Sequence, residues 1–220
     1  MWLHENGYLK EDSLGRYHFV TDMSKGDMKN PKNFREVCSL NGIDFDNIVT
    51  AQQVHGGNVS VAGISHRGTG ISGTDGIISS VKGLVLAVFT ADCMAVFLSS
   101  SKTCAAGIVH AGWRGLAAGV LENAVHSFEE NLGVKSGDLR AAIGPHIREC
   151  CFGVGDEVRQ AFGIRTGAGT IDLSGIAAEK LVKLGVKNIS VNENCTCHNN
   201  GFYSYRRDKT AGRMVSLIKI

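Results

Sequence analysis

The sequence predicts an α+β fold in a single domain spanning residues 1–220, with a mixed β-sheet core flanked by helices. Three observations predict it. Short apolar runs typical of strands recur along the whole chain, and segments with helical periodicity alternate with them. No repeat, low-complexity tract or linker divides the chain. Its 220 residues, 43% of them hydrophobic, are enough for one sizeable core.

The expected strands are short apolar runs bounded by turn residues. They cover residues 17–20, 48–54, 58–62, 84–89, 94–98, 104–110, 139–143, 186–191, 202–206 and 215–220. Residues 70–78 are expected to form a loop that leads into another strand.

Helices are expected over residues 31–41, 116–132, 156–162 and 174–184. Capping residues mark their ends. Asn30 is the expected N-cap of the first helix, and Pro31 suits its first position. Gly133 and Gly185 follow the second and fourth helices as stop residues.

Composition and charge exclude several classes of function. The formal net charge is +2 and no block of Lys and Arg is present, so bulk charge does not indicate binding to nucleic acid or to a membrane surface. The opening segment 1-MWLHENGYLKEDSLGRYHF-19 lacks the apolar region of a signal peptide, and no uncharged apolar run reaches the ~18 residues of a membrane span. The cysteine count is odd, at seven, so we expect reduced thiols in a cytoplasmic protein.

Three segments end an apolar strand with a residue type that binds metals. They are 52-QQVHGG-57, 91-ADC-93 and 108-IVHAGWRG-115. His55, Cys93 and His110 offer imidazole and thiolate ligands for zinc, and three protein ligands leave a fourth position open, as in catalytic zinc sites. Taken alone, a strand histidine more often forms hydrogen bonds in the core and a cysteine more often packs there. Spacing by itself therefore favours these plainer roles over zinc.

Two carboxylates lie near these segments. Asp92 interrupts the most apolar part of the chain, where an unpaired carboxylate is costly. It is expected either to orient a metal-ligating histidine or to act as an acid or base facing a cavity. Asp75, in 73-GTDG-76, is a second candidate for that role or a simple turn residue.

Two cysteine-containing segments are expected to have plainer roles. The stretch 195-CTCH-198 carries three ligand types in four residues, but neighbours this close rarely reach one metal together, so a polar loop or a supporting role is favoured. Cys150 and Cys151 are expected to pack. His198 and His146 are the candidates for a fourth ligand if the zinc site is closed and purely structural.

Arginines in or near these segments are candidates for holding an anion. They are Arg67, Arg114, Arg206 and Arg207. Guanidinium groups suit phosphate, although a solvent-exposed strand end explains 204-SYRRD-208 equally well. The sequence has no P-loop, dinucleotide-binding glycine motif or nucleophile elbow.

Seven motifs follow one another along the chain: 53-QVHG-56, 73-GTDG-76, 90-TADC-93, 109-VHAGWRG-115, 142-AIGP-145, 151-CFGVGDEV-158 and 203-YSYRRDKTAGRM-214. In this combination and order they resemble the laccase-domain family, formerly called multicopper polyphenol oxidases and now regarded as zinc-containing purine nucleoside phosphorylases. In that family the metal is held by the His of QVHG, the Cys of ADC and the His of VHAGW. The resemblance places those ligands at His55, Cys93 and His110.

The resemblance implies phosphorolysis of adenosine, inosine and methylthioadenosine, with hydrolytic deamination of adenosine as a further activity. It implies zinc as cofactor, or copper in the older view of the family, and purine nucleosides and phosphate as small-molecule partners. Our own assignment, which the motifs do not fix, is that Cys93, Asp75 and Asp92 are catalytic. Arg67, Arg114 and Arg206 are expected to bind substrate or phosphate.

The chain departs from the family pattern in three places. The family usually has proline two residues after the metal cysteine, where this chain has Ala95, and its Gly-Pro-x-Ile-Gly becomes 144-GPHIR-148. Residues before about Ile48 match the pattern poorly. These departures leave the ligands intact and bear on the cavity wall, hence on the choice of substrate.

Three other functions fit parts of the pattern. A Cys-His hydrolase would use Cys93 as nucleophile and His110 as base. A copper-dependent phenol oxidase fits poorly, because multicopper oxidases use many histidines in His-x-His pairs and the eight histidines here form none. A zinc-binding module without activity would need a fourth protein ligand.

Overall fold

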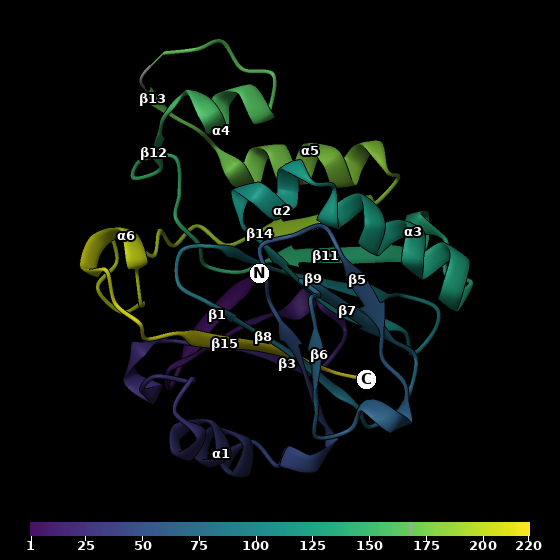
Figure 1. Ribbon diagram of the computed structural model, residues 1–220. Helices are drawn as coiled ribbons and strands as arrows, with labels where there is room; N and C mark the ends of the chain where they lie inside the picture. Colours follow the sequence, from purple (N-terminus) through teal and green to yellow (C-terminus); the bar gives the residue numbers. More distant parts are fainter. Residues whose placement is uncertain (168) are drawn as a thin grey trace.

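Two large β-sheets pack face to face, and helices cover their outer faces, in the computed structural model of the chain (Figure 1). The structure describes residues 1–167 and 169–220. In order across the seven-stranded sheet lie β1 (Trp2–Glu5), β2 (Tyr8–Glu11), β3 (His18–Thr21), β15 (Met214–Lys219), β8 (Val85–Thr90), β4 (Ile48–Gln52) and β6 (Gly70–Ser72). In order across the six-stranded sheet lie β14 (Asn188–Val191), β11 (Leu139–Ile143), β9 (Met94–Ser100), β10 (Ala106–Ala111), β7 (Gly76–Ser79) and β5 (Val59–Val61).

Both sheets mix parallel and antiparallel pairs. β8 pairs antiparallel with β15 and parallel with β4, while β11 pairs antiparallel with β9 and parallel with β14. A separate two-stranded sheet joins β12 (Gly153–Val154) and β13 (Gly169–Thr170). The predicted single domain with a mixed sheet core is thus confirmed.

Helices form the outer layers. α1 (Pro31–Leu40) covers the seven-stranded sheet, and α2 (Trp113–Ala117), α3 (Val120–Leu132) and α5 (Leu173–Lys183) cover the six-stranded sheet (Figure 1). α4 (Asp156–Ala161) and α6 (Tyr205–Asp208) are short. Single 3-10 turns lie at Asp12–Leu14, Met23–Lys25, Phe45–Asn47, Ile64–His66 and Ser136–Asp138. None of the helices described in residues 1–167 and 169–220 has both the length and the apolar character needed to cross a membrane.

The core follows the period of two that strands impose on their side chains. Along β9, Ala95 and Phe97 face the other sheet, whereas Val96 and Leu98 face the helices. All four are essentially inaccessible to solvent. Because both faces of this strand are buried, its sequence is a continuous apolar run and not an alternating one.

Most of the predicted elements are confirmed to within two residues at each end. The N-cap of α1 is as expected, since the Asn30 side chain accepts a hydrogen bond from the Lys32 amide. The single helix expected over 116–132 is in fact two, because Gly119 adopts a left-handed φ of 81° between α2 and α3.

Three other predictions of secondary structure were wrong or incomplete. Residues 202–206 do not form a strand, because Ser204 caps a short helix by accepting a hydrogen bond from the Arg207 amide. The expected loop over residues 70–78 contains β6, which pairs with β4. The N-terminal hairpin of β1 and β2 was not anticipated.

Candidate active site

Two of the three predicted metal ligands lie where the chain passes from one sheet to the other, and the third lies at the end of a strand. His55 belongs to the connection from β4 to β5, Cys93 to the turn from β8 to β9, and His110 to the end of β10. One ligand atom from each lies within 4.8 Å of the other two. The two imidazole rings are perpendicular, with centroids 4.8 Å apart. The fold therefore brings together residues that are widely separated in sequence.

The backbone at two of these turns is unusual. His55 has a φ of 59° and Asp92 has a φ of 84°, values that side chains other than glycine rarely adopt. Such conformations persist only where the surroundings hold them in place. At His55 the restraint is the Asp75 carboxylate, which accepts hydrogen bonds of 2.8–3.1 Å from the amides of residues 54, 55 and 56.

Asp75 also holds His110. Its carboxylate lies 2.7 Å from His110 Nδ1, which leaves Nε2 as the ring nitrogen free to bind a metal. Burial alone would raise the pKa of Asp75, but hydrogen bonds from His110, Gly56 and Val54 outweigh burial and lower it. Asp75 is completely buried and does not line the cavity described below. This position gives it the task of orienting ligands and does not fit the expected contact with a substrate proton.

The electrostatics favour a thiolate at Cys93. Burial opposes ionisation, but interactions with His110 and His55 lower the pKa of Cys93 to about 6. In turn, Asp75 and Cys93 raise the pKa of His110 to about 9 against the effect of burial. A thiolate and two imidazoles around one point form the donor set of a zinc site with an open position.

Gly112 leaves room for this arrangement. A Cβ atom at Gly112 would lie 3.0 Å from Cys93 Sγ and 3.4 Å from the Cδ2 atom of His55. The residue is also the N-cap of α2, with an ordinary φ of −76°. Its lack of a side chain thus serves the packing of the two ligands and not the backbone conformation. The donor set and this close approach both fit a bound zinc ion.

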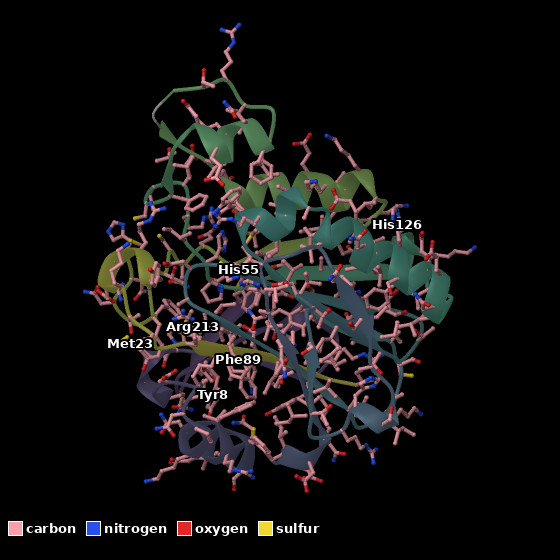
Figure 2. All side chains as sticks on the ribbon, in the orientation of Figure 1. Tyr8, Met23, His55, Phe89, His126 and Arg213 are labelled. Carbon is pink, nitrogen blue, oxygen red and sulfur yellow. The ribbon has the colours of Figure 1, made fainter. Side chains whose placement is uncertain are left out.

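A cavity of about 700 Å³ opens over the three ligands. Its aromatic wall consists of Phe89, Trp113, Phe152 and Tyr205, and its basic side chains are Lys29, Arg114, Arg206, Lys209 and Arg213. Asp92 is the one acidic residue among the described residues that line it. Phe89 and Arg213 lie near His55 although they come from distant parts of the chain (Figure 2). This excess of positive charge makes the cavity suitable for an anion.

The basic side chains are held in defined places. The Arg114 guanidinium stacks 4.3 Å from the Trp113 ring, and the Lys29 ammonium lies 4.4 Å from the Phe89 ring. Burial and the positive charge of Arg213 lower the pKa of Lys29. The Arg206 guanidinium donates to the carbonyls of Cys151 and Gly153, which fixes its orientation at the cavity edge.

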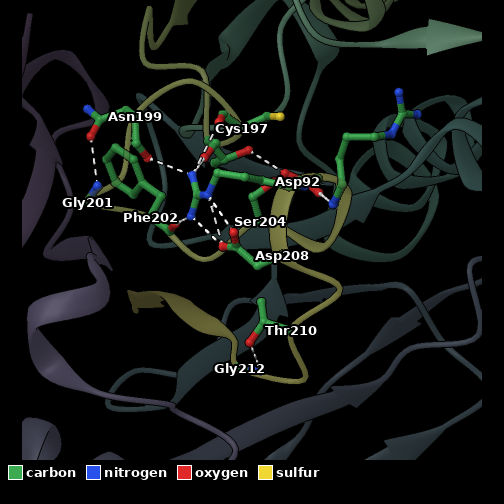
Figure 3. A network of polar contacts seen from close by, with 12 residues as sticks. Asp92, Cys197, Asn199, Gly201, Phe202, Ser204, Asp208, Thr210 and Gly212 are labelled. Atoms are coloured by element: carbon green, nitrogen blue, oxygen red, sulfur yellow. Dashed lines mark hydrogen bonds and ion pairs between the residues drawn. The ribbon is translucent and has the colours of Figure 1, made fainter.

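Asp92 connects the cavity floor to two neighbouring segments (Figure 3). One carboxylate oxygen accepts a 2.7 Å hydrogen bond from the Thr196 hydroxyl, and the other accepts a 2.7 Å hydrogen bond from the Arg206 amide. Its own carbonyl accepts from the Ile147 amide. The carboxylate therefore anchors the start of α6 while remaining in the cavity wall.

Among the predicted anion-binding residues, the structure brings Arg114 and Arg206 to the cavity but not the other two. Arg67 is exposed, follows the turn at Ile64–His66 and does not line the cavity. Arg207 pairs with Asp208 and donates to backbone carbonyls, including that of Phe202, so it supports the fold (Figure 3). Neither His146 nor His198 joins the group of His55, Cys93 and His110.

Sequence reasoning missed much of the cavity wall. Trp113, Lys209 and Arg213 lie inside the family motifs, so those motifs could have suggested them. Lys29 lies just before α1, in a segment without any recognisable motif. Nothing in the sequence alone pointed to it, because only the tertiary fold brings it to this site.

Comparison with known proteins agrees with this geometry. A family model described as multi-copper polyphenol oxidoreductase laccase matches residues 19–220. The chain belongs to this laccase-domain family. The match includes residues 19–47, so the family relationship extends further toward the N-terminus than the motifs alone indicate.

Relatives of this laccase-domain protein carry a consistent name. Purine nucleoside phosphorylase YfiH of Escherichia coli is 40% identical over 156 residues, which cover 66% of this chain and 63% of that protein, less than two thirds of its length. Purine nucleoside phosphorylase YlmD of Geobacillus stearothermophilus is 30% identical over 210 residues, covering 84% of this chain and 77% of that protein.

Solved structures share the whole laccase-domain fold. The crystal structure of YlmD from Geobacillus stearothermophilus has a TM-score of 0.92 at 26% identity, covering 99% of this chain and 98% of that chain. That of a Bacillus licheniformis hypothetical protein YfiH has a TM-score of 0.93 at 25% identity, covering 100% and 98%.

Proposed function

We propose that the chain is a zinc-dependent purine nucleoside phosphorylase that acts on adenosine, inosine and methylthioadenosine and also deaminates adenosine. The observation that carries this proposal is the convergence of three metal-type ligands on the floor of a cavity with aromatic and basic walls. The name shared by the relatives, purine nucleoside phosphorylase, supports the same class of reaction. The reduced Cys93 that the site requires favours the cytoplasm.

The cavity chemistry suits both substrates of phosphorolysis. In this reaction an oxygen of inorganic phosphate bonds to C1′ of the ribose while the bond from C1′ to the purine nitrogen breaks, and the departing purine takes up a proton. Arg114 and Arg206 can hold the phosphate oxygens, and Trp113 and Phe152 offer flat faces to the purine. A volume of about 700 Å³ accommodates a nucleoside and a phosphate together.

The remaining roles follow from position. Asp92 is the carboxylate in the cavity wall and is our candidate for moving a proton to or from the substrate. Asp75 holds the backbone of His55 and the ring of His110 through its hydrogen bonds to both residues. Zinc held by His55, Cys93 and His110 would supply a Lewis acid and, for deamination, an activated water. Deamination replaces the amino group on C6 of adenine by an oxygen of water, and the amino group leaves as ammonia.

A direct assay tests the proposal. Protein of defined zinc content is incubated with adenosine, with and without phosphate, and the products are separated. We expect adenine and ribose 1-phosphate only when phosphate is present, and inosine in both cases. Cys93→Ala should abolish both activities, whereas Cys104→Ala, at the opposite end of β10, should retain them. Absence of phosphate-dependent adenine release from zinc-loaded protein would contradict the proposal.

One observation favours a second candidate, a Cys-His hydrolase. Cys93, His110 and Asp75 form a series of thiol, imidazole and orienting carboxylate, with 2.7 Å between His110 Nδ1 and Asp75. Iodoacetamide distinguishes the two functions. A zinc-bound Cys93 thiolate should resist alkylation until a chelator is added, whereas a free nucleophile should react at once with matching loss of activity.

Copper-dependent phenol oxidation, the chemistry in the family description, can be tested on the same preparation. Copper-loaded protein is incubated with a phenol under oxygen, beside the zinc-loaded protein in the nucleoside assay. Phenol turnover with copper and no nucleoside turnover with zinc would favour the oxidase.

A further inference from the structure

A second group of metal-type side chains lies outside the cavity. Cys150, Cys151 and His198 each place one ligand atom within 4.8 Å of the other two. The Sγ atoms of Cys150 and Cys151 are 3.7 Å apart. Cys150 is exposed, so the expectation that it packs is wrong, whereas Cys151 packs against the core as expected. The stretch 195-CTCH-198 forms the expected turn, and its part in a metal site was not anticipated.

Two hydrogen-bonded turns present these side chains to each other. In residues 148–152 the amides of Cys151 and Phe152 both donate to the Arg148 carbonyl. In residues 195–199 the Asn199 amide donates to the Cys195 carbonyl. A β-bridge between His146 and Cys195 places the two turns side by side.

Cys195 lies beside this group, on the turn that carries His198. Its sulfur accepts a hydrogen bond from the Arg148 amide at 3.4 Å. Backbone amides that donate to sulfur stabilise a thiolate, and such donors commonly accompany metal-bound cysteine. Cys150, Cys195 and His198 also line one shared surface cleft.

We propose that Cys150, Cys151, Cys195 and His198 form a second, structural zinc site. The set contains four protein ligands, the number typical of closed structural sites, in contrast to the three at the cavity floor. Cys195 and His198 are separated by two residues, a spacing that lets a single turn supply two ligands. The adjacent Cys150 and Cys151 come from the other turn, so the ion joins two segments more than 40 residues apart.

The distances suit zinc. Two sulfur atoms bound to tetrahedral zinc at about 2.3 Å are about 3.8 Å from each other. The 3.7 Å between the Sγ atoms of Cys150 and Cys151 is close to this value. These two neighbouring thiols therefore already have the separation that a shared zinc ion requires.

The site is linked to the cavity through its two turns. The turn 148–152 supplies the Cys151 carbonyl that accepts from the Arg206 guanidinium. The turn 195–199 supplies the Thr196 hydroxyl that donates to Asp92. Zinc at this position would thus hold in place the supports of one basic and one acidic side chain of the cavity wall.

Metal content gives the first test, and it does not depend on the proposed activity. Wild-type protein purified without chelators should contain about two zinc ions per chain, one for each ligand group. The double variant Cys150→Ser/His198→Ala should contain one, and so should His55→Ala/His110→Ala. The matched control Cys104→Ser/His126→Ala changes the same residue types elsewhere and should retain two.

Cobalt substitution distinguishes the sites by their ligands. The proposed site offers three thiolates and the cavity site offers one, so sulfur-to-cobalt charge-transfer absorption should fall mostly in Cys150→Ser/His198→Ala. The His55→Ala/His110→Ala variant should lose a smaller share of this charge-transfer absorption. Equal losses in the two double variants would contradict the proposed ligand set.

A measurement on the wild-type protein covers the case in which the double variant does not fold. Cys150 and Cys151 should resist iodoacetamide until a chelator removes the zinc, as peptide mass spectrometry would show. Alkylation at the same rate with and without chelator would overturn the proposal. So would a wild-type zinc content of one per chain, or a disulfide among these cysteines in protein isolated without oxidant.

Discussion

Asp75 accepts hydrogen bonds from three consecutive amides around His55 and also binds His110 Nδ1. One buried carboxylate thereby fixes the backbone that carries one metal ligand and the ring orientation of another. Its negative charge is compensated within the protein by these donors. The geometry of the proposed metal site consequently depends on a residue that does not line the cavity.

Asp75→Asn should weaken zinc binding at the His55 site by at least about tenfold, as loss of a supporting carboxylate typically does. The amide would lack the negative charge that attracts His110 and would direct an N–H donor at backbone N–H groups. Competition with a chromophoric chelator measures the change. Asp46→Asn, on the exposed surface, is the matched control, and equal zinc affinity in the two variants would contradict this role.

His18 should make the fold sensitive to acid. Burial lowers the pKa of His18 despite its hydrogen bond to the Arg16 carbonyl, and its Nε2 atom accepts from the Glu11 amide, which only the neutral ring can do. An unfolded histidine titrates near pH ~6.5. The stabilisation is therefore complete above that pH and is lost as the pH falls below it, toward the lowered pKa of the folded state.

Urea unfolding at pH 7 and pH 5 tests this expectation. The fall in the free energy of unfolding between the two pH values should be smaller in His18→Gln than in the wild type. His126→Gln changes an exposed histidine of α3 and should leave the fall as it is (Figure 2). If the free energy of unfolding falls equally in all three proteins, His18 is not the cause of the pH dependence of stability.

At the scale of elements, the start of α2 is closely fitted to the metal ligands. The change Gly112→Ala should displace Cys93 and His55, because the new Cβ would lie 3.0 Å from Cys93 Sγ. We expect a loss of zinc and of turnover with the fold retained, since the φ of −76° suits alanine. Gly155→Ala, at the N-cap of α4 with no atom within 4 Å of its Cβ, should have little effect. Normal zinc content in Gly112→Ala would contradict this account.

Helices and strands whose ends are set by neighbouring residues in the sequence could be predicted, whereas those that depend on distant contacts could not. Asn30 and Pro31 specify the start of α1 by themselves. In contrast, α6 has a local cap at Ser204 but also depends on the carboxylate of Asp92, more than 100 residues away, which accepts from the Arg206 amide. The same distinction holds for the site: the three ligands stand in recognisable motifs, whereas Lys29 reaches the cavity only through the tertiary fold.

At the scale of the whole molecule, the proposed metal site connects the two sheets. His55 and Cys93 lie on connections that leave the seven-stranded sheet, and His110 ends a strand of the six-stranded sheet. The ligands come together only when both sheets have formed. Zinc should therefore bind the folded chain in preference to the unfolded chain and stabilise it.

A chelator should lower the melting temperature of the wild-type protein. If free zinc exceeds its dissociation constant about 100-fold, binding contributes about 2.7 kcal/mol, which is roughly 5–10 °C for a chain of this size. Differential scanning calorimetry with and without chelator measures the shift. The chelator should lower the melting temperature of Cys93→Ala less than that of the wild type. It should lower that of Cys104→Ala by as much as that of the wild type. The same melting temperature with and without chelator would argue against a resident metal.

The position of β15 has a consequence for how the protein is made. β15 lies inside the seven-stranded sheet and pairs residues 214–219 with β8 on one side and β3, near the N-terminus, on the other. During synthesis, β3 can pair with β2 early, but its other edge has no partner until almost 200 further residues have been added. At the usual rate of translation this interval lasts roughly 10–40 s. Throughout it the nascent chain carries an unpaired strand edge that other chains can reach, which makes its yield in the cell depend on protection at the ribosome.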